Sequence, residues 1–145
     1  MKLNYFLLVS LLLLSSIAFA QSNVIKKEKW HWNSSQQDTI AGYAQVVKVD
    51  NILYISGVVS TELTPAGIDR VYKALEFALK SNGATFQNVV KENLYTTDIV
   101  EMIKHNHIRK KYYNNDYPAA TWVQITRLFT DNAKLEVELI AHLPK

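Results

Sequence analysis

The chain has 145 residues, no cysteine and a formal net charge of +3. The lack of cysteine excludes disulfides, thiol chemistry and a lipid anchor attached through cysteine. Lys2 is the only charged residue among the first 20, so without them 15 basic residues face 13 acidic ones, a net charge of +2. This near-neutral balance gives no support for a protein that binds nucleic acid or a membrane surface.

The first 20 residues have the pattern of an export signal. Lys2 gives a short positive start, residues 6–14 are apolar apart from one serine, and Ala18–Ala20 has the small-residue spacing of a cleavage site. A membrane anchor is the competing interpretation, but the apolar run is shorter than the roughly 20 residues that span a bilayer. We therefore expect a signal peptide over residues 1–20. The mature protein would be periplasmic or secreted, with no membrane attachment after cleavage.

Residues 21–40 are expected to form an N-terminal arm with a short edge strand around Trp30–Trp32. Residues 44–49 and 52–56 are rich in β-branched and aromatic side chains. Two polar residues, Asp50 and Asn51, separate these runs, so the pair predicts a β-hairpin.

The spacing at which apolar residues recur along the sequence changes after the hairpin. From residue 68 to residue 80, apolar side chains recur at intervals of three and four, which predicts a helix that ends before Asn82-Gly83. A second helix is predicted over residues 98–113, with Asp98 as its N-cap. Three further strands are predicted at residues 88–96, 121–128 and 134–142.

The predicted order is therefore β-β-α-β-α-β-β in a single α+β domain over residues 41–145, with room for one more strand at the front. Two amphipathic helices would cover one face of a mixed sheet. Apolar residues are also expected on the other face, at Val47, Val49, Tyr54, Trp122 and Ile140. An exposed apolar patch of this kind usually marks an oligomer interface.

Several segments resemble, in order and spacing, the Rid/YjgF family of reactive intermediate deaminases, which hydrolyse imines and enamines. The matching segments are Gly42–Gln45, Ile52–Gly57, Ala84–Lys91, Asn106–Ile108, Tyr117–Gln124 and Leu135–Ala141. The resemblance implies a chorismate-mutase-like fold, assembled as a homotrimer whose sheets form an inner barrel. It also implies ligand clefts between neighbouring subunits, and no cofactor.

The resemblance further implies the residues of a site. Tyr43 matches a tyrosine in the family's cleft, and Glu136 matches a glutamate on the last strand. Ser56 and Gly57 match a Ser-Gly pair whose backbone helps to hold substrate and water. We therefore expect Tyr43 and Glu136 to be catalytic. We expect these four residues to contact the ligand, together with Ala120 and Trp122.

Two positions depart from the family pattern. In the archetype, an arginine in Pro-Ala-Arg-Ser binds the carboxylate of a 2-imino acid, and this chain has Ala120 there. Losing such a bidentate contact costs on the order of 2–4 kcal/mol. Trp122 occupies a position where the archetype has a small residue. Arg127 is expected on the opposite strand face, and Arg70 and Arg109 are expected to face solvent, so none of the three would substitute.

Simpler structural interpretations stay open for some of these residues. Glu136 fits as the polar partner of Glu138 on an alternating strand, and Tyr43 fits as a core residue. His105 and His107 are two residues apart on a predicted helix and diverge by about 200°, so we expect no metal site there.

Three functional hypotheses follow. The first is an exported trimer that binds a small metabolite in inter-subunit clefts, with weak or altered deaminase activity. The second is an active imine or enamine deaminase for a substrate without an α-carboxylate, in which Tyr43, Glu136 and backbone groups position the water. The third is endoribonuclease activity, a name attached to some family members. Near-neutral charge and the absence of a basic and aromatic stripe disfavour it.

Overall fold

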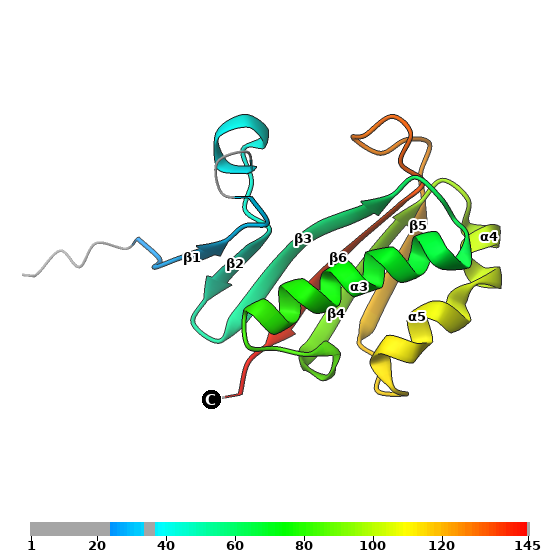
Figure 1. The fold of residues 1–145 in the computed structure, drawn as a ribbon. Helices are drawn as coiled ribbons and strands as arrows, with labels where there is room; N and C mark the ends of the chain where they lie inside the picture. The colour runs from blue at the N-terminus through cyan, green and yellow to red at the C-terminus, as the bar shows by residue number, and fades with distance from the viewer. Residues whose placement is uncertain (1–23, 34–36, 145) are drawn as a thin grey trace, which may run out of the picture.

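The computed structural model describes residues 24–33 and 37–144, and the predicted signal peptide over residues 1–20 lies outside them. The described chain forms one six-stranded sheet in the order β1-β2-β3-β6-β4-β5 (Figure 1). All neighbouring strands are antiparallel except β4 and β5, which are parallel. The strands are β1 (Glu28–Trp30), β2 (Val46–Val49), β3 (Ile52–Ser60), β4 (Val89–Thr96), β5 (Ala119–Gln124) and β6 (Leu135–His142).

The helices lie on one face of this sheet, as predicted (Figure 1). They are α3 (Pro65–Ser81), α4 (Ile99–Lys104) and α5 (Asn106–Tyr113), with single turns at η1 (Gln37–Ala41) and η2 (Phe86–Asn88). The α+β class, the predicted order of elements and the extra strand at the front are all confirmed. The arrangement is that of the chorismate-mutase-like fold.

Helix α3 has the apolar face and the end that the sequence predicts. It begins three residues earlier than expected, because Pro65 suits the first helical position and the Thr64 hydroxyl accepts a hydrogen bond from the Gly67 N–H at 3.1 Å. The chain leaves the helix through Gly83, whose φ of +77° is the left-handed conformation that glycine tolerates. The apolar face, including Ile68 and Leu75, is buried against the sheet.

The prediction of one continuous second helix was wrong. Asp98 caps the first part as expected, accepting a hydrogen bond from the Glu101 N–H at 3.0 Å. The helix is then interrupted at His105, whose backbone lies outside the α region at φ −102° and ψ 10°. The His105 ring nitrogen lies 2.9 Å from a Glu101 carboxylate oxygen. The interruption gives α5 a direction and a buried face of its own.

The last strand, β6, lies at the centre of the sheet between β3 and β4. Its alternation is as predicted, with Leu135, Val137, Leu139 and Ala141 buried beneath the helices. The intervening side chains project from the uncovered face. One assignment to that face was wrong: Trp122 pairs across the strands with buried Leu94 and therefore lies on the helix-covered face.

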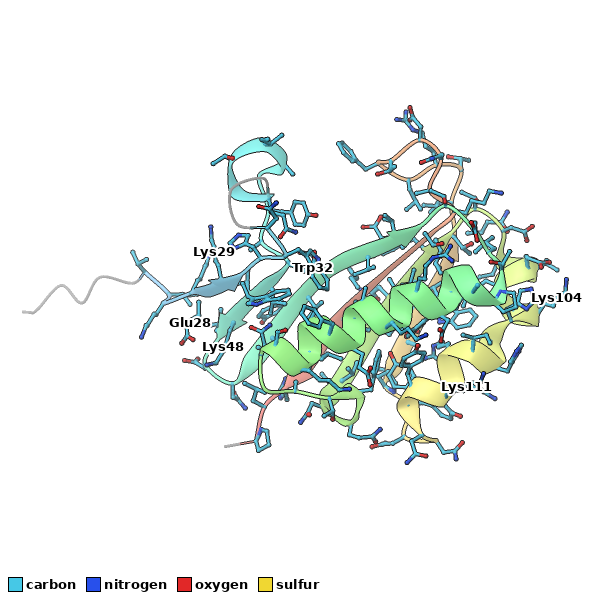
Figure 2. The ribbon with its side chains drawn as sticks, in the orientation of Figure 1. Glu28, Lys29, Trp32, Lys48, Lys104 and Lys111 are labelled. Atoms are coloured by element: carbon cyan, nitrogen blue, oxygen red, sulfur yellow. The ribbon has the colours of Figure 1, made fainter. Side chains whose placement is uncertain are left out.

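The N-terminal arm is fixed to α3 by aromatic stacking. The strand predicted around residues 30–32 ends at Trp30, and Trp32 instead stacks on Phe77 of α3 with ring centroids 5.5 Å apart (Figure 2). Trp30 meets Trp32 edge-on at 5.0 Å. The arm thereby leads the chain into η1, which forms part of the candidate site.

Candidate functional site

Four of the predicted site residues lie around one hollow of about 500 Å³. They are Tyr43, Ser56, Gly57 and Glu136, and the remaining lining residues are Ile40, Ala41, Val59, Phe129 and Thr130. In Figure 1, η1 and the loop between β5 and β6 rise on the same side of the view, and both contribute to the rim of this hollow. None of these described lining residues is lysine, arginine or histidine.

A bulge in β3 brings Glu136 against the backbone of Gly57. The register between β3 and β6 shifts between Ile55 and Val58, so that Gly57 lies in the irregular segment. A methyl group on Gly57 would lie 2.6 Å from Cγ of Glu136 and 2.7 Å from its Cδ. Glycine is therefore required here for the close approach of the glutamate.

Glu136 has the properties of an acid–base residue. Burial raises the pKa of its carboxyl group, and the neighbouring charge of Glu138 raises it further. Among the described residues, no donor bonds the Glu136 carboxylate. Glu138, by contrast, accepts hydrogen bonds from Asn93 at 2.7 Å and from the Tyr95 hydroxyl at 3.3 Å. Glu136 is thus the carboxylate left available to a ligand in the hollow.

Ser56 positions the chain and leaves no N–H for a ligand. Its N–H donates to the Gln45 carbonyl at 2.9 Å, and its hydroxyl donates to the Ala44 carbonyl at 2.8 Å. The Gln45 side chain donates back to the Ser56 carbonyl at 2.8 Å and accepts from Gln37 at 3.2 Å. These bonds fix the segment that carries Tyr43 on the rim of the hollow.

Ala120 and Trp122 do not meet this hollow within one chain. In the parallel register of β4 and β5, Ala120 pairs with Glu92 and Trp122 pairs with Leu94. Both side chains therefore lie on the helix-covered face, whereas Glu136 projects from the uncovered face. A single chain presents the predicted site as two separate parts.

The second part contains a buried ion pair whose residues are not among the predicted site residues. Glu92 is 0% exposed, and Arg109 of α5 donates from Nε to its carboxylate at 2.7 Å. Three neutral donors complete the shell of Glu92: the hydroxyls of Tyr72 and Tyr113, at 3.1 and 2.6 Å, and the Trp122 indole N–H at 3.1 Å. Burial and the charge of Glu92 raise the pKa of both tyrosines, which keeps them protonated as donors.

The expectation that Arg109 faces solvent was therefore wrong. A signal for the pair was present, because Glu92 lies two residues before Leu94 and so shares its buried face, and Arg109 lies four residues before Tyr113 on one helix face. Two opposite charges in phase with core residues on separate elements predict a buried pair. Arg127 lies beyond β5 in the following loop and pairs with Asp131, rather than on the opposite face of a strand.

Among residues 24–33 and 37–144, no three histidine, aspartate or glutamate side chains gather where they could hold a metal ion. The rings of His105 and His107 lie 6.2 Å apart, and His105 contacts Glu101. No helix of this described part is long and apolar enough to cross a membrane.

Comparison with known proteins agrees with this architecture. Residues 33–143 match the protein family described as Endoribonuclease L-PSP. The chain is 33% identical over 111 residues to the 2-iminobutanoate/2-iminopropanoate deaminase of Rattus norvegicus, covering 70% of this chain and 80% of that protein. It is 32% identical to a RutC family protein of Saccharolobus solfataricus, covering 70% of this chain and 87% of that protein.

Solved structures give the same result for the fold. A member of the YjgF/YER057c/UK114 family from Mycobacterium tuberculosis superposes with a TM-score of 0.72 at 21% identity, over 81% of this chain and 100% of that one. A Thermotoga maritima protein described as a putative endoribonuclease gives a TM-score of 0.70 at 24% identity, over 81% and 99%. Sequence match, strand order and helix placement all agree, and the chain belongs to the Rid/YjgF family.

Proposed function

We propose that the mature protein is exported, assembles as a homotrimer and binds a small metabolite in clefts between subunits, with deaminase activity that is weak or altered. The observation that carries this proposal is the contact between Glu136 and Gly57 in the lining of a hollow whose described lining has no cation. An acid–base group is in place, while the family's carboxylate-binding arginine is replaced by Ala120. The relative from Rattus norvegicus is named for 2-imino acid substrates.

Imine hydrolysis defines what Glu136 would do. A water molecule attacks the C=N carbon, the nitrogen gains protons, and the bond between that carbon and nitrogen breaks to release ammonia and a carbonyl compound. Glu136 as carboxylate would take a proton from the attacking water and return it to the leaving nitrogen. A raised carboxyl pKa brings this group closer to neutral pH, where it can serve in both steps.

A second candidate is an imine or enamine deaminase for a substrate without an α-carboxylate. The hollow favours it, because an anionic substrate would meet the charge of Glu136 without a compensating cation in the lining. A protonated imine, by contrast, would be attracted by Glu136. Apolar side chains at Ile40, Val59 and Phe129 would suit the rest of such a substrate.

Ammonia release from freshly generated imines tests both candidates. We expect the wild-type protein to hydrolyse 2-iminopropionate little above the spontaneous rate. A rate similar to that of an arginine-bearing relative would contradict the proposal. Hydrolysis of an imine without a carboxylate, lost in Glu136→Gln and kept in the surface variant Glu76→Gln, would favour the second candidate. Mass spectrometry of co-purifying metabolites would identify the ligand.

A further inference from the structure

The buried guanidinium of Arg109 has donors that the protein does not use. Arg109 is 5% exposed, and its single hydrogen bond within the described chain runs from Nε to Glu92. The two terminal amino groups make no hydrogen bond to any described residue. These two amino groups are not among the buried atoms that lack a partner, so each reaches solvent and is open to water or a ligand.

Glu92 does not need these terminal groups. Its carboxylate already accepts from Arg109 Nε, from two tyrosine hydroxyls and from the Trp122 indole. The attachment through Nε holds the guanidinium in one orientation while leaving its bidentate end unengaged. Burial alone would lower the pKa of Arg109, but Glu92 raises it overall, so the group stays charged.

The guanidinium lies where β5 begins. Its Cζ is 4.7 Å from the ring centroid of Tyr113, 5.9 Å from that of Tyr117 and 5.4 Å from that of Trp122. Tyr117 precedes Ala120, the exposed alanine whose strand partner is Glu92. Position 120 therefore carries only a methyl group opposite Glu92, the partner of this guanidinium.

A second polar group on the same helix also lacks a partner. Oδ1 of Asn106 is buried and accepts no hydrogen bond. Asn106 lies three residues before Arg109, and residues at this spacing are neighbours on one side of a helix. α5 thus carries an unused acceptor about one helical turn before the residue with unused donors. Together these groups would suit a carboxylate that has an N–H or O–H group nearby.

We propose that Arg109 takes over the task of the missing arginine: its terminal amino groups bind the carboxylate of a small imino or oxo acid beside Ala120, with Asn106 Oδ1 as an adjacent acceptor. This inference rests on the proposed function, because the Glu136 hollow that would complete the cleft comes from a neighbouring subunit. Since Arg109 shares its charge with Glu92, the contact is weaker than that of an unpaired arginine. The expected activity on 2-imino acids is therefore weak rather than absent.

The test uses the stable oxo acid pyruvate, with acetone as the analogue that lacks the carboxylate. The variants are Glu92→Gln, the double variant Glu92→Gln/Arg109→Gln, and Arg70→Gln as an exposed-arginine control. The double variant avoids leaving a buried carboxylate unpaired. Binding is measured by calorimetry and by the indole N–H signal of Trp122 in 15N-labelled protein, assigned with Trp122→Phe.

We expect pyruvate, and not acetone, to shift the Trp122 signal in the wild-type protein. The double variant should bind pyruvate at least about tenfold more weakly. Glu92→Gln should bind it more tightly than the wild type, because the guanidinium is then unshared; a merely structural role would weaken both variants. If Glu92→Gln does not fold, pyruvate binding by the double variant decides whether Arg109 binds the carboxylate.

Equal pyruvate binding in the wild type and the double variant, or no response in the wild type, would overturn the inference. Light scattering and ammonia release, measured on the same samples, distinguish a failure of the Arg109 subsite from a failure of the proposed function. A trimer that releases ammonia equally with and without Arg109 keeps the proposed function and rejects the Arg109 subsite. A monomer without any release rejects both.

Discussion

Glu136 and Gly57 make the most constrained contact in the hollow. The bulge in β3 and the glycine at its centre let a partly buried carboxylate lie against backbone. The same contact limits which substitutions the site tolerates, and it places an ionisable group where its charged form is disfavoured.

Gly57→Ala is expected to destabilise the fold by about 1–3 kcal/mol, because the added methyl group overlaps the Glu136 side chain. Urea unfolding measures the effect. The control repeats Gly57→Ala in a protein that already carries Glu136→Ala, which removes the overlapping atoms. In that background Gly57→Ala should cost much less, and an unchanged cost would mean that the clash lies elsewhere.

Glu136→Gln should change stability in a pH-dependent way. The folded state raises the pKa of Glu136 above its ordinary value, so folding favours the neutral carboxyl group. The stabilisation from this neutral group is fully present below the ordinary pKa, and it is lost as pH rises through the raised pKa. Glutamine stays neutral, so the variant should match the wild type near pH 4 and exceed its free energy of unfolding near pH 8. A difference that does not vary with pH would contradict this assignment.

Ala120→Arg is expected to recover little 2-imino acid hydrolysis, less than about a tenfold gain in ammonia release. The new guanidinium would lie directly opposite Glu92 and close to the charge of Arg109, so it would be drawn toward the buried carboxylate. Adding Trp122→Cys opens volume beside the new side chain and should recover more. A folded, inactive double variant would favour a binding protein over an enzyme.

The sequence resemblance grouped residues that the fold brings together in one part of the candidate site. Motif resemblance placed Tyr43, Gly57 and Glu136, which do lie around one hollow. It did not identify Glu92 or Arg109, although each lies in phase with core residues of its own element. A buried ion pair depends on two elements meeting, and that relation is set by packing.

Among the elements, the N-terminal arm has a clear role in positioning the site. Trp32 donates its backbone N–H to Gln37 at 2.7 Å and stacks on Phe77. Gln37 in turn bonds Gln45, which holds the bulge at Ser56. The arm is therefore connected to the hollow through a chain of amide hydrogen bonds.

Trp32→Ala should release the arm from α3 and increase hydrogen exchange in residues 37–45, with a stability loss of about 1 kcal/mol from the aromatic contacts. Val100→Ala is the control, because Val100 is 73% exposed and lies in α4, outside the lining of the hollow. Equal exchange in both variants would show that the arm is not held by Trp32.

The order of helices and strands was predictable from the spacing of apolar residues alone. The residues at which these elements begin and end were less predictable. The period in α3 and the alternation in β6 each report a face that is truly buried. The interruption at His105 had no such signal, because apolar spacing continues on both sides of it. The strand ends at Trp30, and Trp32 stacks on Phe77 of α3. Strand propensity alone does not predict this contact.

The uncovered sheet face carries exposed apolar side chains, among them Tyr54, Val59 and Val123. We expect a trimer in light scattering at micromolar concentration, because this area needs cover. Tyr54→Lys should shift the protein toward monomer, whereas Val100→Lys, on the outer side of α4, should not. A wild-type monomer would contradict the assembly and the cleft between subunits.

The central position of β6 has a consequence for biosynthesis. It is the last strand of the described chain, yet both β3 and β4 depend on it for their facing edges, and its pairing joins residues as distant as Ile52 and His142. Such long-range pairing slows folding. A nascent chain that has not yet released residues 135–142 from the ribosome exposes two unpaired strand edges, the condition that invites aggregation. Premature termination before β6 should therefore yield insoluble product, not a smaller folded domain.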